Sequence, residues 1–152
     1  KKTGTPPRCD LEKEKTLHTT LLGLIQSGLV KSAHDCSEGG LAVALAESGI
    51  SQQVARETPR LLGANIDLST ITDVRTDALL FGETQSRVVI TVKADDAVKV
   101  IERAKILGVS AMKIGTVGGT DLRIKTAGGE FTWPLVQLHE PWWNTIARAM
   151  QA

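Results

Sequence analysis

The sequence predicts an α+β domain in which helices pack on a mixed or antiparallel sheet. Short β-branched or aliphatic runs that indicate strands lie between amphipathic stretches with helical spacing. The two kinds do not alternate strictly, as they would in a parallel sheet, and the last two strands are joined by a glycine turn typical of a hairpin. The 152 residues are the length of one domain, so we expect one core.

The chain begins with a polar segment, 1–10, which contains two prolines. We interpret it as a linker from a preceding domain and expect the folded domain over 11–152. Asp10 is placed to cap a first helix, because a side-chain oxygen there satisfies free N–H groups of the first turn. Helical spacing of leucines follows, and Gly28 is a natural helix stop.

The middle of the chain predicts strands and helices in the following order. Residues 29–33 indicate a buried strand, 34–40 a polar turn and 41–48 a close-packed helix rich in Ala and Leu. Helix end and loop are expected over 49–63, which contains Pro59. We then expect a strand over 65–68, a short helix over 73–80 capped by Asp73, and a strand over 87–92.

The last third predicts two more helices and three strands. Asp95 or Asp96 is expected to cap a helix whose apolar stripe is Ala97, Ile101, Ala104 and Leu107. Strands are expected over 111–117, 122–126 and 131–134. A final helix has apolar residues at helical spacing and is interrupted by Pro141, which predicts a kink or a fresh start; its apolar residues are Leu135, Leu138, Trp142, Ile146 and Met150.

Composition excludes several classes of function. A net charge of +1 provides no basic field for nucleic acid, so we expect no nucleic-acid partner. No apolar run approaches the about 20 residues that span a membrane, so we expect no membrane partner. The two cysteines cannot form a disulfide framework and contain no CxxC pair, which fits a cytoplasmic protein.

The first candidate site is the segment 32–41, where a predicted strand ends and a helix begins. Free N–H groups at a helix start favour an anion such as phosphate, and Gly39 and Gly40 allow close approach. Ser37 is placed to cap the helix or to donate to a phosphate oxygen. Asp35 and the neighbouring Glu38 oppose a bare phosphate and suit either Mg²⁺ bridging to one or plain capping.

Two other interpretations of this segment remain open. In the first, it is a strand–turn–helix connection whose glycines serve packing and whose His34 is held by hydrogen bonds. In the second, His34 activates Cys36 as a nucleophile, but no orienting acid or oxyanion device accompanies the pair. We therefore assign no catalytic residue and no metal ligand in this chain.

The second candidate site is the segment 80–87, directly before a strand. Glu83, Thr84 and Gln85 provide a carboxylate, a hydroxyl and an amide for ligand groups, and Arg87 has the geometry to fork a carboxylate or phosphate. The alternative is a hydrogen-bond network that closes the loop on itself. Of two adjacent tryptophans on the last helix, Trp142 and Trp143, one is expected in the core and the other in the core or against a partner.

Together these motifs resemble one known family. The run His34-Asp35-Cys36-Ser37-Glu38-Gly39-Gly40-Leu41-Ala42 and the run Glu83-Thr84-Gln85-Ser86-Arg87 are similar to the second carboxy-terminal half-domain of the phosphoribosylformylglycinamidine synthase (PurL) family. The family's usual Ser is Thr84 here, which keeps the hydroxyl. The resemblance covers nearly the whole chain and implies the fold of the C-terminal domain of aminoimidazole ribonucleotide (AIR) synthase.

The resemblance also implies a function. The family is an ATP-dependent C–N ligase of purine biosynthesis that converts formylglycinamide ribonucleotide and ammonia from glutamine to formylglycinamidine ribonucleotide. ATP and Mg²⁺ would bind mainly in domains absent here, so this chain alone is expected to be inactive. Its expected partners are other domains of the same polypeptide and, in the small form of the enzyme, a glutaminase subunit and a small bridging subunit.

What this half-domain itself binds is left as two alternatives. It is either part of a ligand site, or a non-catalytic half of the pseudo-dimer with an auxiliary nucleotide or phosphate site. A domain of another AIR-synthase-related enzyme and a free-standing binding protein are further options. The candidate substrate- or phosphate-binding residues are His34, Asp35, Ser37, Gly39, Gly40, Glu83, Thr84, Gln85 and Arg87.

Overall fold

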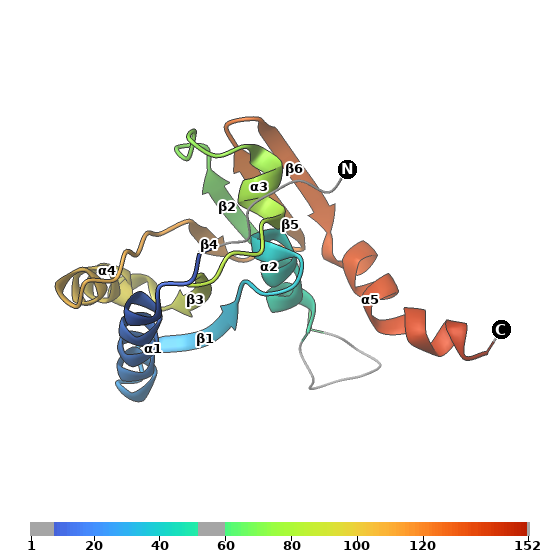
Figure 1. Ribbon diagram of the computed structural model, residues 1–152. Helices are drawn as coiled ribbons and strands as arrows, with labels where there is room; N and C mark the ends of the chain where they lie inside the picture. The colour runs from blue at the N-terminus through green and yellow to red at the C-terminus, as the bar shows by residue number, and fades with distance from the viewer. Residues whose placement is uncertain (1–7, 52–59, 152) are drawn as a thin grey trace.

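The computed structural model of the chain describes residues 8–51 and 60–151 and has the predicted α+β architecture (Figure 1). Parts of the predicted linker (1–7) and of the predicted loop (52–59) lie outside the described residues. The elements are α1 (Leu11–Gln26), β1 (Val30–Asp35), α2 (Gly40–Ile50), β2 (Ala64–Leu68), α3 (Thr76–Phe81), β3 (Val88–Val92), the 3₁₀ helix η1 (Ala94–Asp96), α4 (Ala97–Ile106), β4 (Gly115–Val117), β5 (Asp121–Thr126), β6 (Gly129–Pro134) and α5 (Leu135–Ala149).

The strands of the described residues form two separate sheets. β1 and β3 pair antiparallel, and the larger sheet has the order β4-β2-β5-β6. In the larger sheet β2 and β5 are parallel, whereas the other two pairs are antiparallel. The pairings are interleaved along the chain. β1 pairs with β3, although β2 lies between them in the sequence, and β2 pairs with β5, although β3 lies between them.

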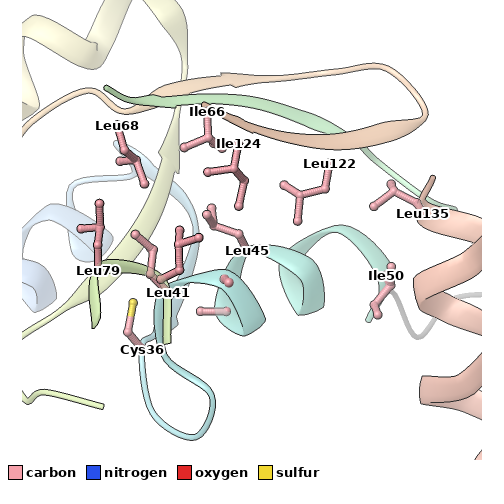
Figure 2. Close-up of a cluster of buried hydrophobic side chains, with 13 residues drawn as sticks. Cys36, Leu41, Leu45, Ile50, Ile66, Leu68, Leu79, Leu122, Ile124 and Leu135 are labelled. Carbon is pink, nitrogen blue, oxygen red and sulfur yellow. The ribbon is translucent and has the colours of Figure 1, made fainter. Parts of the chain in front are cut away.

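The core lies where α2 packs on one face of the larger sheet. Leu41 and Leu45 of α2 point toward apolar side chains of β2 and β5, among which Leu68 and Ile124 are fully buried (Figure 2). Along β5 the buried residues alternate with outward-facing charged ones, as the two-residue period of a strand requires. Leu79 of α3 closes the side of this core next to Cys36.

The helix starts confirm the predicted cap of α1 and correct those of α2 and α3. The Asp10 carboxylate accepts hydrogen bonds from the backbone N–H groups of Glu12 and Lys13, each at 3.2 Å, as predicted. α2 begins after Gly39 and has no side-chain cap, so the predicted capping by Ser37 is wrong. α3 begins three residues later than predicted, at Thr76, so Asp73 does not cap it.

Several predicted boundaries and faces also change. β1 continues through His34 and Asp35, because both residues pair with β3 and are not part of the turn. β4 is confined to Gly115–Val117, so 111–114 are not strand. On α4, Val100 is buried and Leu107 is exposed, which corrects the predicted stripe. Asp96 precedes α4 but makes no side-chain capping bond.

α5 differs most from its prediction. It runs through Pro141 as one helix, so no fresh helix starts there. Leu135 is buried, but Ile146 and Met150 are exposed although their spacing predicted a core face. Figure 1 shows the reason, since α5 leaves the body of the molecule as it runs toward the C-terminus. Among the described residues, no helix has the length and hydropathy that crossing a membrane requires.

Candidate functional site

The two candidate motifs meet in one cleft of about 370 Å³. Its walls come from three segments that are far apart in the sequence. The first motif contributes Asp35, Cys36 and Ser37, and the second motif contributes residues 83–88. Helix α1 contributes Glu14, Leu17 and His18.

The pairing of β1 with β3 brings the two motifs together. Asp35, at the end of β1, lies opposite Val88, at the start of β3. One step further the backbone N–H of Cys36 donates to the carbonyl oxygen of Arg87 at 2.9 Å. The two motifs therefore meet at the same end of this two-stranded sheet and face one another there.

Glu83 binds the start of α2. Its Oε1 accepts a hydrogen bond from the backbone N–H of Gly39 at 2.9 Å. Gly39 is the residue before the first turn of α2, where free N–H groups and the helix dipole favour negative charge. A carboxylate from the second motif thus accepts one N–H group at this helix start, and phosphate binding there stays a prediction.

Gly40 explains how the two motifs approach so closely. Its φ is +67°, and a Cβ atom there would lie 2.8 Å from the carbonyl oxygen of Gly82 and 2.9 Å from the carbonyl carbon of Phe81. The contacts are with backbone, which cannot swing aside like a side chain. Only glycine fits this position, and the first turn of α2 rests directly on the end of α3.

Arg87 is engaged inside the domain. Its guanidinium donates to the carbonyl oxygen of Leu79 at 3.2 Å and to that of Gly82. Both acceptors lie at the end of α3, so Arg87 fastens the second motif to that helix. Its buried Nε has no hydrogen-bond partner in the part of the chain that the structure describes. Bidentate binding of a ligand carboxylate or phosphate by Arg87 stays a prediction. Two of the guanidinium nitrogens already donate hydrogen bonds within the domain.

The first motif divides between the cleft and α2. The Ser37 hydroxyl donates to the Asp35 carboxylate, and this bond is the main cause that lowers the pKa of Asp35. His34 does not line the cleft. Its Nδ1 lies 2.7 Å from the Asp35 carbonyl oxygen and its Nε2 lies 3.2 Å from Oε2 of Glu47 on α2. The structure thus keeps Asp35 and Ser37 at the site and separates His34 from it.

The arrangement opposes a Cys–His nucleophile. Cys36 is buried, and burial raises the pKa of its thiol, with the nearby Arg87 acting in the opposite direction. A thiol held neutral is a poor nucleophile. His34 binds other groups, so no base is shown to activate Cys36.

Thr84 and Gln85 are the polar cleft residues whose side chains are available for hydrogen bonding. Both are exposed and line the cleft, and within the described residues neither side chain makes a hydrogen bond. Their hydroxyl and amide can donate and accept. Both side chains are therefore available to bind a ligand or a neighbouring domain.

The α1 wall was not predicted. Glu14 accepts a hydrogen bond from the Ser86 hydroxyl, and its carboxylate lies 3.4 Å from Nε2 of His18. Ser86 has a positive φ of 64°, which places its side chain in this unusual turn. No local pattern marks Glu14, because its partner is 72 positions away. The cleft as a whole is acidic, since Glu14, Asp35 and Glu83 outnumber Arg87.

Over residues 8–51 and 60–151, no group of three or more His, Cys, Asp or Glu side chains is arranged to hold a metal ion. The acidic cleft residues alone therefore do not fit a complete Mg²⁺ site, and a bound ion would need donors from elsewhere.

Comparison with known proteins gives a consistent result. The sequence model of "AIR synthase related protein, C-terminal domain" matches residues 1–126. The phosphoribosylformylglycinamidine synthase subunit PurL of Anaeromyxobacter dehalogenans is 37% identical over 99% of this chain and 20% of its own length. The PurL subunit of Caldanaerobacter subterraneus is 42% identical over 97% of this chain and 19% of its own length. The chain therefore spans about a fifth of the length of these relatives.

Solved structures show the same fold. Thermotoga maritima PurL complexed with FGAR superposes with a TM-score of 0.69, at 22% identity, over 83% of this chain and 21% of that one. Another structure of T. maritima phosphoribosylformylglycinamidine synthase II has a TM-score of 0.69 at 20% identity, over 88% and 22%. T. maritima PurL is also known complexed with ATP, with a TM-score of 0.66 at 23% identity, over 82% and 21%.

Proposed function

The chain belongs to the AIR synthase related family, whose C-terminal domain it matches, and from this membership we propose that it is the carboxy-terminal domain of a phosphoribosylformylglycinamidine synthase. The parent enzyme would be an ATP-dependent C–N ligase of purine biosynthesis. It would convert formylglycinamide ribonucleotide and ammonia from glutamine to formylglycinamidine ribonucleotide. The similarity to PurL subunits over nearly the whole chain supports this proposal.

The observation that carries a ligand role for this domain is the meeting of both motifs in one acidic cleft. The carboxylates of Asp35 and Glu83 would repel a bare phosphate, whereas they accept hydrogen bonds from hydroxyl and N–H groups. Thr84 and Gln85 offer further donors and acceptors. We propose that the cleft faces a hydroxyl- or amide-bearing part of a substrate, and that phosphate groups are bound by other domains.

ATP and Mg²⁺ are proposed to bind mainly outside this domain. The helix start that would suit a phosphate already binds Glu83, and the described residues do not complete a metal site. When bound, the nucleotide would supply the phosphoryl group that activates the substrate amide. This chain's own residues would position one wall of the substrate site.

It follows that the isolated chain is proposed to be inactive. One domain cannot surround two substrates and align their reacting atoms. The proposed partners are the other domains of the same polypeptide and, in the small form, a glutaminase subunit and a small bridging subunit. We propose that the assembly works in the cytoplasm.

The test is a pair of variants in the full-length enzyme that contains this chain. Gln85→Ala removes a cleft side chain that has no hydrogen bond within the described part of the domain, and Gln26→Ala, at the exposed end of α1, is the matched control. Losing one hydrogen bond to a substrate costs about 0.5–1.5 kcal/mol, which is a loss of about twofold to twelvefold in kcat/KM.

The assay is ammonia-dependent product formation, with the melting temperature measured in parallel. We expect Gln85→Ala to lose activity at an unchanged melting temperature and Gln26→Ala to change neither. Unchanged kinetics in the Gln85→Ala enzyme would exclude a direct ligand role for this side chain.

A structural role is the second candidate function, and two contacts favour it. Glu83 and Arg87 use their charged groups to fix the start of α2 and the end of α3. If the domain is only a support, Arg87→Ala will lower the melting temperature and activity together, while Gln85→Ala will leave both unchanged. Steady-state kinetics of the two variants therefore separate the two roles.

A further inference from the structure

The aromatic residues of the chain are concentrated at its C-terminal end. The sequence contains three tryptophans, two phenylalanines and no tyrosine. Phe131 and Trp133 lie on β6 and stack on one another with ring centroids 5.8 Å apart. Trp142 and Trp143 lie on α5, where each is 44% exposed. Tryptophan is costly to leave in water and is common at the centre of interfaces, so this helix calls for a covering surface.

α5 presents an apolar row that nothing in the described part of the chain covers. Trp143, Ile146 and Met150 follow one another at spacings of three and four residues, which places them on one face of the helix. Ile146 is 74% exposed and Met150 is 83% exposed. We call these three residues the α5 row. Single exposed apolar side chains are ordinary, but a continuous row marks a surface that binds another.

The other face of α5 is polar and already satisfied. Arg148 forms an ion pair with Glu140, and the Asn144 amide donates to the same carboxylate at 3.4 Å. His139 stacks over Trp143 with an interplanar angle of 11° and so stiffens one end of the row. The helix is therefore two-sided, with one face suited to water and one suited to an apolar groove.

The comparisons indicate what covers the row. The family's own sequence model ends at residue 126, before β6 and α5. The PurL relatives nevertheless align over 97–99% of this chain, while the chain accounts for only 19–20% of their length. β6 and α5 are thus shared with these much longer proteins and lie beyond the part described for the wider family.

We propose that the α5 row docks into an apolar groove on another domain of the same, longer polypeptide. This inference rests on the proposed function in one respect, namely that the chain is one domain of a larger enzyme. A tethered domain acts at an effective concentration of about millimolar, so it would occupy the row ahead of a second copy of the chain. Docking would fix the position of the domain and, through β6 and β5, of the core sheet.

The two methionines provide a direct test. Met112 is 54% exposed and Met150 is 83% exposed, and no other methionine occurs in the sequence. Oxidation of methionine by dilute peroxide depends on exposure and is read at each site by peptide mass spectrometry. We expect Met150 to oxidise faster than Met112 in the isolated chain, and slower than Met112 in the full-length enzyme.

Matched variants control for changes in folding. Ile146→Lys places a charge in the α5 row, and Ile106→Lys places the same charge at the end of α4, where Ile106 is 84% exposed. In the full-length enzyme, Ile146→Lys should restore fast oxidation of Met150, and Ile106→Lys should not. If Ile146→Lys does not fold, the oxidation rates of Met150 and Met112 in the wild-type isolated chain and the wild-type full-length enzyme still test the proposal.

Two results would overturn the proposal. One is a Met150 to Met112 ratio that is the same in the full-length enzyme and in the isolated chain. The other is protection of Met150 that appears only as protein concentration rises, which would assign the row to a second copy. The readout is independent of catalysis, so a full-length protein that lacks synthase activity but protects Met150 would refute the proposed function and leave the docking intact.

Discussion

Replacing Gly40 with alanine tests the contact that joins the two motifs. At this position the added Cβ meets two penalties. The first is the positive φ of 67°, which costs an L-residue about 1–2 kcal/mol. The second is the approach to the backbone of Phe81 and Gly82, at 2.9 and 2.8 Å, which forces a backbone shift that typically costs about 1–3 kcal/mol.

Gly28 is the matched control. It follows α1 with a φ of 74°, and a Cβ atom there would have nothing within 4 Å. Gly28→Ala therefore carries the penalty for φ without the collision. A smaller unfolded-state entropy offsets about 0.4–1 kcal/mol in both variants. We expect a net loss of about 1 kcal/mol for Gly28→Ala and about 2–4 kcal/mol for Gly40→Ala.

Chemical denaturation of the two variants measures this difference, and thermal melting gives a second reading. For a domain of this size, 1 kcal/mol corresponds to about 2–4 °C, so Gly40→Ala should melt clearly below Gly28→Ala. Equal losses in the two variants would show that the close approach of α2 to the end of α3 contributes nothing, and the reasoning would fail.

Three further predictions concern the core and the cleft. Ile124→Ala should lower the free energy of unfolding by about 2–5 kcal/mol in urea titrations, because Ile124 is fully buried; a loss below about 1 kcal/mol would contradict this packing. Ser37→Ala should raise the pKa of Asp35, as followed by NMR titration, because the hydroxyl favours the ionised carboxylate. The stability that this hydrogen bond provides is present above the ordinary carboxyl pKa and is lost as pH falls through the lowered pKa of folded Asp35. An Asp35 pKa that does not change in Ser37→Ala would refute the role of the hydroxyl. Cys9 should be alkylated well before Cys36, and equal alkylation rates would contradict the burial of Cys36. The free energy of unfolding should fall as pH rises past the ordinary thiol pKa, because the unfolded chain ionises Cys36 more readily than the folded chain does.

Local patterns were sufficient to predict much of the fold. The sequence predicted a strand over 122–126 after a glycine turn, and Asp10 predicted the start of α1; both are confirmed. Such signals act over a few residues, so they often hold whatever the rest of the fold does. Asp73 shows where they fail, since a residue with a good capping side chain lies just outside a helix that begins elsewhere.

The candidate site was predicted in its parts and not in its geometry. The sequence marked both motifs, but the bond from Gly39 to Glu83 spans 44 positions and depends on the register of β1 with β3. Glu14 could not be predicted for the same reason. On α5 the helical period correctly predicted an apolar face, but periodicity does not say whether that face meets the same domain, and Ile146 does not.

The interleaved strand pairings have a consequence for how the chain is made. Ala64 in β2 pairs with Leu122 in β5, which is 58 positions later, and β1 likewise waits for β3. At about 5–20 residues per second, a ribosome needs about 3–12 s to reach β5, the parallel partner of β2. For most of that interval, until β4 (Gly115–Val117) has been made, β2 has no partner strand. We therefore expect the larger sheet of the nascent domain to be completed only after β5 has left the ribosome.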